Sequence, residues 1–218
     1  MAYRETERTV AKRENTREGI VGAAFDLVAS DGYRAVSMAG VAECAGIAVG
    51  SVYNYFPSKA ELLAEVFRRA SGHELAITRA AAAENGTARE RLVATIATFT
   101  QRSLRGRRLA WALLAEPVDQ LVEVERLAFR RAYRDIFVRI VEDGISASEL
   151  PDQDVELTAA AMVGAISEAL VGPLSPIAAV NDPDDVVKAL LPVCLRAVGA
   201  TVEATGELAL PRRQEGVS

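Results

Sequence analysis

The sequence predicts an all-α protein in which an amino-terminal helix-turn-helix unit of three helices precedes a larger helical body, with about nine helices in total. Apolar residues recur at three- and four-residue spacing through most of the chain, whereas no stretch shows the two-residue alternation of a strand. Half of the 218 residues are hydrophobic, which is enough to bury a substantial core. Glycine and proline fall mostly between the periodic segments and would separate one helix from the next.

The first periodic segment begins at Thr16, after polar residues 1–14 that are expected to be disordered or only partly helical. Its apolar residues repeat at three and four positions, and Asp31 followed by Gly32 predicts a turn at its carboxyl end. We expect this helix to brace the segment that follows it.

Residues 37–59 predict two short helices joined by a glycine turn. Ser37 is suited to cap the first helix with its hydroxyl, and Gly46 supplies the permissive backbone of the turn. The second helix, residues 48–53, must end before Pro57, because proline disfavours helix in the residue that precedes it. A pair of helices of this size fits the major groove of DNA.

Hydroxyl and amide side chains on the second helix, together with nearby cations, predict an edge that docks on DNA. Tyrosine and asparagine hydrogen-bond phosphates or base edges, while lysine and arginine pair with the phosphate backbone. The predicted DNA-binding residues are Arg13, Arg17, Ser37, Val49, Gly50, Ser51, Tyr53, Asn54, Tyr55 and Lys59. On spacing alone one alternative stays open, a compact three-helix corner in which Tyr53 and Phe56 are core aromatics.

The same region resembles a known protein family. The stretch AAFDLVASDGYRAVS, residues 23–37, is followed by GSVYNYFPSK, residues 50–59. In order and spacing this is similar to the amino-terminal pattern of TetR-family transcriptional regulators. The match runs from Thr16 to about Phe67. It implies a DNA-binding regulator with a helical effector-binding domain behind the helix-turn-helix unit.

Two positions depart from the family pattern. Ala48 and Val49 stand where the family usually has serine followed by a polar or basic residue. Ala48 cannot cap the second helix, and Val49 cannot hydrogen-bond a base. We therefore expect direct base readout to be sparse, with Val49 touching a thymine methyl group.

Beyond Pro57 the sequence predicts six further helices, separated by glycine, proline and asparagine. Their residues are 59–84, 87–105, 109–115, 118–145, 159–171 and 183–198. The 118–145 helix is apolar on two faces, the second marked by Val124 and Leu127, so we expect it to lie centrally and to end at Gly144. This organisation divides the chain into a DNA-binding domain (1–57), an effector-binding and dimerisation domain (58–205) and a disordered tail (206–218).

Aromatic and apolar residues from several of these helices, with a few polar side chains, would suit a small-molecule pocket. Each of them alone is more often plain core, but the resemblance implies an effector cavity. The predicted ligand-binding residues are His73, Phe99, Arg102, Trp111, Phe129, Tyr133, Phe137, Met162, Ile166 and Glu168, with Arg130 and Arg134 as further polar candidates. We also predict that the helix containing Trp111, which has a breaker at each end, moves when ligand binds.

The last two helices carry more apolar surface than one partner helix can cover, and their small residues allow close approach. The predicted dimer contacts are Ala161, Gly164, Ala165, Leu191, Leu195 and Val198. Burial within one subunit would explain only part of this set. Members of the family that the chain resembles also pair through their last two long helices.

Other functional classes find little support in the sequence. There is no HxxxH or CxxC pair, no glycine-rich phosphate loop and no nucleophile elbow, so we predict no enzyme activity, no cofactor and no metal. The two cysteines, Cys44 and Cys194, are far apart, and we expect Cys44 to be a small buried thiol. With no signal peptide and no apolar run of membrane-spanning length, the predicted location is the cytoplasm, without membrane contact.

The net charge of −5 argues against a broadly basic surface, but residues 1–70 hold equal numbers of acidic and basic side chains. The leading hypothesis is a homodimeric, ligand-responsive regulator that binds a near-palindromic double-stranded operator and is released by a small hydrophobic or amphipathic effector. The alternative is a helical small-molecule-binding protein of the same fold that no longer recognises DNA.

Overall fold

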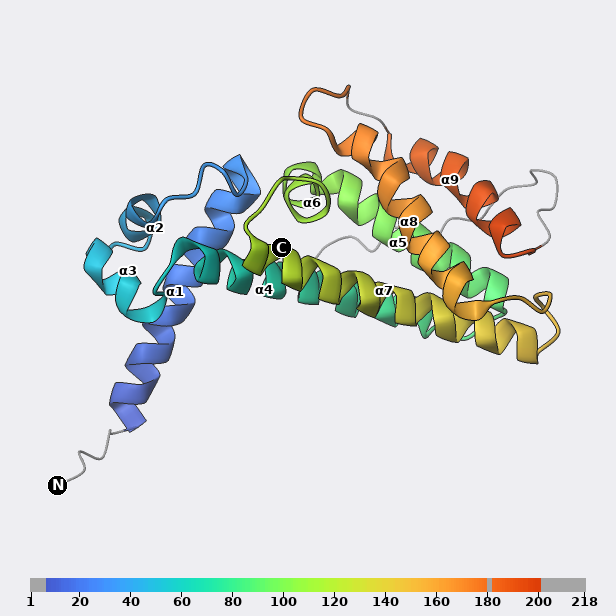
Figure 1. Cartoon of the computed structure of the whole chain (residues 1–218), viewed down its shortest axis with the longest axis horizontal. Helices are drawn as coiled ribbons and strands as arrows, with labels where there is room; N and C mark the ends of the chain where they lie inside the picture. Colours follow the sequence, from blue (N-terminus) through green and yellow to red (C-terminus); the bar gives the residue numbers. More distant parts are fainter. Residues whose placement is uncertain (1–6, 180–181, 201–218) are drawn as a thin grey trace.

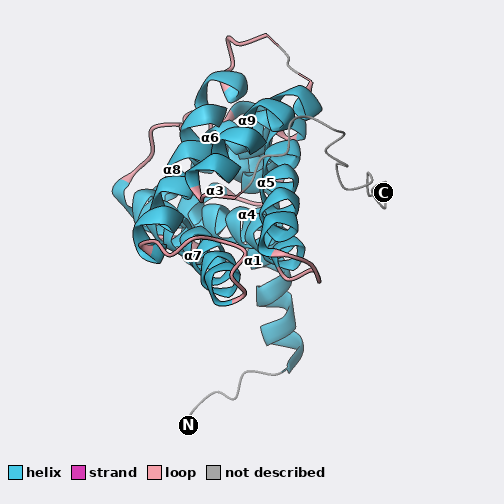
Figure 2. Cartoon of the chain, turned by 90° about the vertical axis from the view of Figure 1, so that its right-hand side faces the viewer, coloured by secondary structure: helices cyan, strands magenta, loops and turns pink. Residues whose placement is uncertain are grey.

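The computed structural model describes residues 7–179 and 182–200, and within these ranges the chain forms nine α helices and no strand (Figure 2). The helices are α1 (Glu7–Asp31), α2 (Met38–Cys44), α3 (Val49–Tyr55), α4 (Lys59–Ala82), α5 (Ala88–Arg105), α6 (Arg107–Leu114), α7 (Gln120–Ser146), α8 (Val155–Leu174) and α9 (Pro183–Ala197). The all-α prediction is thereby confirmed, and the predicted tail lies outside the described residues.

Figure 1 shows α1, α2 and α3 gathered at one end of an elongated molecule, while α5, α8 and α9 lie at the other end. The long helices α4 and α7 run side by side along the molecule, and the short α6 lies between the amino-terminal unit and the remaining helices. The helix-turn-helix unit is therefore attached to the helical body through α4 and α6.

Helix α1 begins at Glu7, so the prediction that it starts at Thr16 was wrong. The segment before Thr16 has no apolar stripe, because its side chains are mostly exposed and polar. Helix formers such as glutamate, arginine and lysine sustain the helix there, and the Thr16 hydroxyl donates to the Lys12 carbonyl at 2.9 Å. Apolar periodicity marks only the half of α1 that packs on the core, beginning at Ile20.

The helix-turn-helix forms largely as its caps and turn predict. The Ser37 hydroxyl accepts a hydrogen bond from the Gly40 amide at 3.0 Å and so caps α2. Gly46 has a φ of 65°, the left-handed conformation that glycine adopts readily. Ala48 precedes α3 without a side-chain cap, and α3 extends to Tyr55, two residues beyond its predicted end.

Helix α4 belongs to both hydrophobic cores of the protein. Its first half contributes Leu62, Val66 and Phe67 to the amino-terminal core, whereas its second half contributes Leu75 and Ala82 to the core of the helical body. Ser58 caps it, accepting from the Glu61 amide at 3.2 Å. The division of the chain at residue 57 stays a prediction, but the packing of the amino-terminal unit continues well past it.

The helical body departs from prediction at several helix ends. Gly144 lies inside α7, which continues to Ser146, and Pro173 lies inside the last turn of α8. Each helix nevertheless ends within two residues of its glycine or proline, close to the predicted position. Val124 and Leu127, expected on a second buried face of α7, are about half exposed, so the amino-terminal part of α7 is apolar toward solvent as well.

Replacing Gly144 by alanine tests the close packing around α7. The added Cβ would lie 2.7 Å from the Ala88 Cβ and from a Leu150 methyl group, closer than carbon atoms allow. We expect the free energy of unfolding to fall by about 1–3 kcal/mol because the neighbouring segments must move apart. Urea denaturation measures the change.

The matched control is Gly22→Ala, also within a helix but with nothing within 4 Å of its added Cβ. Alanine should stabilise there by about 0.5–1 kcal/mol, because glycine loses more conformational freedom in a helix. Equal stability changes in the two variants would contradict the packing described around Gly144.

Candidate functional site

The exposed side of α3 forms one candidate surface. Val49 is 40% exposed and Tyr53 is 49% exposed, while Gly50 and Asn54 are also on the surface. Val52 on the opposite side is fully buried in the amino-terminal core and holds the helix in place. Because Tyr53 is exposed, it is not the core aromatic that the three-helix-corner alternative requires, whereas Phe56 is buried.

The other predicted DNA-binding residues are less exposed or already engaged. Ser51, Tyr55 and Lys59 are half-buried, and Tyr55 packs against the amino-terminal core. The Ser37 side chain lies at the exposed start of α2, where its hydroxyl caps the helix.

Arg17 braces the unit instead of extending freely from it. Its guanidinium lies 5.0 Å from the centroid of the Phe56 ring and 3.2 Å from a carboxylate oxygen of Glu65. The cation is therefore shared between an aromatic face and a carboxylate. Arg13, one turn earlier on α1, is exposed.

Glu65 joins α1 to α4. It accepts hydrogen bonds from Arg17 and from Arg69, while Arg68 pairs both with it and with Glu125 of α7. Burial raises the pKa of this carboxyl, but the hydrogen bonds from Arg69 and Arg17 outweigh burial and hold the pKa below its usual value. The charged form of Glu65 therefore stabilises the folded protein.

Cys44 is exposed at the end of α2, so the expectation of a small buried thiol there was wrong. Helix α2 spans only seven residues and buries Met38, Val41 and Ala42 on its inner side, which turns Cys44 outward. Cys194 is buried, and burial raises the pKa of its thiol to about 11.

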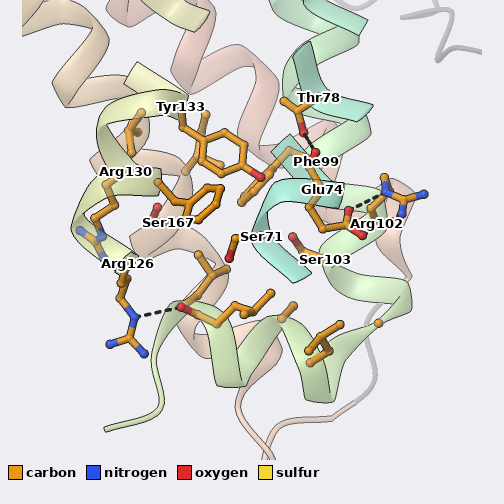
Figure 3. A pocket seen from close by; sticks show the side chains of 18 of the residues that line it. Ser71, Glu74, Thr78, Phe99, Arg102, Ser103, Arg126, Arg130, Tyr133 and Ser167 are labelled. Atoms are coloured by element: carbon orange, nitrogen blue, oxygen red, sulfur yellow. Dashed lines mark hydrogen bonds and ion pairs between the residues drawn. The ribbon is translucent and has the colours of Figure 1, made fainter. Parts of the chain in front are cut away.

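The second candidate site is a cavity of about 110 Å³ enclosed by α4, α5, α6, α7 and α8 (Figure 3). Six predicted ligand-binding residues line it: Phe99, Arg102, Phe129, Tyr133, Phe137 and Ile166. Arg130 lines it as well. The remaining lining residues are Phe67, Ser71, Glu74, Thr78, Thr95, Ser103, Gly106, Leu109, Ala110, Leu113, Leu114, Arg126, Val163 and Ser167.

Four predicted ligand-binding residues do not line the cavity. His73 and Glu168 are exposed, Met162 is buried in the core of the body, and Trp111 packs against that core. Each lies on a helix that does contribute to the cavity wall, but faces another direction. The sequence identified the helices that form the cavity. It did not identify which positions around each helix face inward, because that depends on how the helices pack.

Polar groups on the cavity wall are mostly paired with one another. Arg102 donates two hydrogen bonds to the Glu74 carboxylate, at 2.7 and 2.8 Å. Burial raises the pKa of the Tyr133 phenol above its usual value, so this side chain stays neutral. Arg130 is exposed at the edge and makes no ion pair with any residue that the structure describes.

Arg126 links the cavity wall to the end of α6, a connection that sequence reasoning missed. Its guanidinium donates to the carbonyl oxygens of Ala112, Leu113 and Glu116 at 3.3, 3.0 and 2.8 Å. These carbonyls lie at the carboxyl end of α6, where a cation is favourable. No sequence pattern pairs residues of two helices in this way.

The buried carboxylate of Glu116 continues this connection to the amino-terminal unit. It accepts from the Arg34 amide and from Arg108, each at 3.3 Å. A Cβ at Gly32 would meet Arg108 and Glu116 at 2.5 Å or less, and the φ of Gly32 is 83°. The end of α1 is thus fitted closely against α6.

The predicted dimer contacts fall into two groups. Ala161, Gly164 and Ala165 are exposed on one side of α8. Leu191, Leu195 and Val198 are fully buried within the subunit, so assigning them to a dimer interface was wrong. These three side chains point into the body core, which the apolar pattern of the sequence alone did not distinguish from a second apolar surface.

Comparisons with known proteins agree with this architecture. Residues 20–66 match the family described as bacterial regulatory proteins, tetR family, and residues 85–170 match the tetracyclin repressor-like C-terminal domain. The fatty acid metabolism regulator protein of Bacillus subtilis is 26% identical over 152 residues, spanning 68% of this chain and 78% of that protein. The HTH-type transcriptional repressor KstR of Mycobacterium tuberculosis is 33% identical over 132 residues, spanning 56% and 60%.

Solved structures show the same fold. The regulator FadR from Bacillus subtilis in complex with stearoyl-CoA superposes with a TM-score of 0.71 at 22% identity, covering 83% of this chain and 98% of that one. A TetR/AcrR family regulator from Thermobifida fusca gives a TM-score of 0.65 at 25% identity, covering 83% and 97%.

Replacing Glu65 by glutamine tests the joint between α1 and α4. We expect the free energy of unfolding at pH 7 to fall by about 1–2 kcal/mol, because Arg17 and Arg69 lose a charged acceptor. The folded-state pKa lies below the unfolded one, so the contribution is present above the unfolded value, about 4.3, and is lost as the pH falls through the folded value. Denaturation at a series of pH values measures it.

Wild type and Glu65→Gln should therefore approach each other in stability as the pH falls below the unfolded value. Asp185→Asn is the control, because its pair with Lys188, at 3.5 Å, is largely exposed and should change stability little at any pH. A constant difference between wild type and Glu65→Gln down to pH 3 would contradict the pairing.

Proposed function

Because this chain belongs to the tetR family of bacterial regulatory proteins, we propose that it is a repressor whose α3 enters the major groove of an operator and whose cavity holds the effector that releases it. The observation that carries the proposal is the position of α6. Its residues Leu109 and Leu113 line the cavity and also pack against the amino-terminal core. A molecule that displaces this wall would move the DNA-binding unit as well.

The proposed effector is apolar or amphipathic. Phenylalanine, leucine, isoleucine and valine side chains make up much of the cavity wall, and the Glu74–Arg102 pair leaves little unbalanced charge inside. Arg130 at the edge would favour an anionic end on the effector. The similar FadR structure holds stearoyl-CoA, a ligand with a long apolar chain and an anionic head, which supports this class for the present cavity.

We propose that the active form is a dimer built on the exposed face of α8. This helix is long and apolar enough by composition to cross a membrane, and only about a third of it is buried within the subunit. Leu157 is 68% exposed beside the small residues Ala161, Gly164 and Ala165. A second copy of the chain, packed closely over these small residues, would cover the face.

A mobility-shift titration tests the proposal, with DNA from the promoter region of the gene that encodes this chain. We expect binding that weakens steeply as salt concentration rises, because phosphate contacts release counterions. Stearoyl-CoA should release the DNA. Absence of salt-dependent binding to any of this DNA would instead favour a helical binding protein that no longer recognises an operator.

Substitutions at Lys59 and Val49 should affect DNA binding differently. Lys59→Ala should weaken binding to all operator sequences alike and make the salt dependence shallower, because a phosphate contact is lost. Val49→Ala should weaken binding only to operators that carry the thymine it touches. Titrations against operator variants separate the two effects, and uniform loss in Val49→Ala would count against base contact.

Ala165→Glu tests the dimer. A carboxylate on the small-residue face of α8 would be buried without a partner in the interface, so sedimentation at micromolar concentration should show monomers, and operator binding should be lost with them. The control is Ala76→Glu on the exposed side of α4, which should leave the dimer intact. A dimeric Ala165→Glu protein would place the interface elsewhere.

A further inference from the structure

Three serine residues line the cavity and make no side-chain hydrogen bond to any residue that the structure describes. Ser71 lies on α4, Ser103 on α5 and Ser167 on α8. None of them bonds to another residue within the part of the chain that the structure describes. Figure 3 shows Ser71 and Ser103 among the side chains at the centre of the pocket, with Tyr133 and Phe99 above them.

Ser71 gives the strongest indication of a ligand-binding group among the three serines, because this residue is only 5% exposed. The Ser71 oxygen is not among the fully buried polar atoms without a hydrogen-bond partner, so the little surface that the residue keeps belongs to the space it lines. The Ser71 hydroxyl therefore faces the cavity. Ser71 is therefore a donor and acceptor kept available for a molecule inside the cavity.

Two threonines on the same wall behave in the ordinary way. The Thr78 hydroxyl donates to the Glu74 carbonyl at 2.9 Å, and the Thr95 hydroxyl donates to the Arg91 carbonyl at 2.7 Å. In both cases the threonine hydroxyl bonds to the backbone carbonyl four residues earlier in the same helix, which is a common arrangement. The three serines do not form this bond, so helical geometry alone does not explain them.

The charged residues of the wall do not compete for these hydroxyls. Arg102 and Glu74 satisfy each other with two hydrogen bonds, and Arg126 donates to three carbonyl oxygens of the α6 end. The hydroxyls are left among phenylalanine, leucine and valine side chains. They form a neutral polar spot within an apolar cavity.

We propose that the effector carries a neutral oxygen, a hydroxyl or a carbonyl, within its apolar body, and that Ser71 hydrogen-bonds it with Ser103 and Ser167 nearby. This inference rests on the proposed function of the cavity and narrows its ligand class. A saturated hydrocarbon chain would leave the buried Ser71 hydroxyl unpaired, whereas an oxygenated chain or ring would satisfy it. A hydrogen bond between a buried hydroxyl and the ligand distinguishes strongly between ligands, because a ligand without the oxygen leaves the hydroxyl without a partner.

Matched fatty acids test the inference. The probes are stearate and its 8-, 10- and 12-hydroxy derivatives, with binding to the full-length wild-type protein measured by calorimetry. We expect at least one hydroxy isomer to bind about tenfold more tightly than stearate, the factor expected for one well-made buried hydrogen bond. Equal affinity for stearate and for all three isomers would overturn the inference.

Ser71→Ala should abolish the preference by weakening the hydroxy isomer, while stearate binding stays the same or improves. The control inside the cavity is Thr95→Val, which removes a hydroxyl already committed to a backbone carbonyl and should keep the preference. Retention of the preference in Ser71→Ala would also overturn the inference. Release of DNA by stearoyl-CoA is measured separately in the wild-type protein. That measurement tests the proposed function, whereas the calorimetry tests only the preference for an oxygenated ligand.

Discussion

The structure depends on one constraint: α4 must pack into two hydrophobic cores at once. Its first half closes the amino-terminal unit, and its second half forms part of the body and of the cavity wall. Phe67 marks the junction, since it is buried in the amino-terminal core, lines the cavity and packs against Phe129 of α7 with ring centroids 6.0 Å apart. The two cores therefore share side chains of one continuous helix.

Polar contacts add a second connection beside α4. Arg126 holds the carboxyl end of α6 from the cavity wall, and Glu116, just beyond that end, holds the Arg34 amide at the start of the helix-turn-helix. These contacts are directional, so they tie the orientation of α6 to that of the DNA-binding unit more tightly than apolar packing alone. Both connections lead from the same cavity, which is the geometry that a ligand-responsive regulator requires.

The sequence predicted what local chemistry determines. Ser37 caps α2 as expected, α4 and α5 begin close to the predicted positions behind their caps Ser58 and Thr87, and the helices that enclose the cavity were the right ones. It failed where the result depends on packing between distant segments. The apolar residues Leu191 and Leu195 face inward, although their pattern suits a dimer interface equally well. Ser71 carries no periodic signal at all, since a single serine in a helix predicts nothing until its neighbours are known.

The cavity of about 110 Å³ is smaller than the roughly 300–1,000 Å³ usual for small-molecule sites, so an effector of ordinary size would extend beyond it or widen it. The shortest wall is α6, which has eight residues and no side-chain cap at its start. Helices α4 and α7 are three times longer and pack against each other along the molecule. Helix α6 is also joined to the end of α1, because Arg108 donates to the Asp31 carbonyl and pairs with Glu116. If the proposed function holds, an effector that displaces α6 would therefore also move the helix-turn-helix unit.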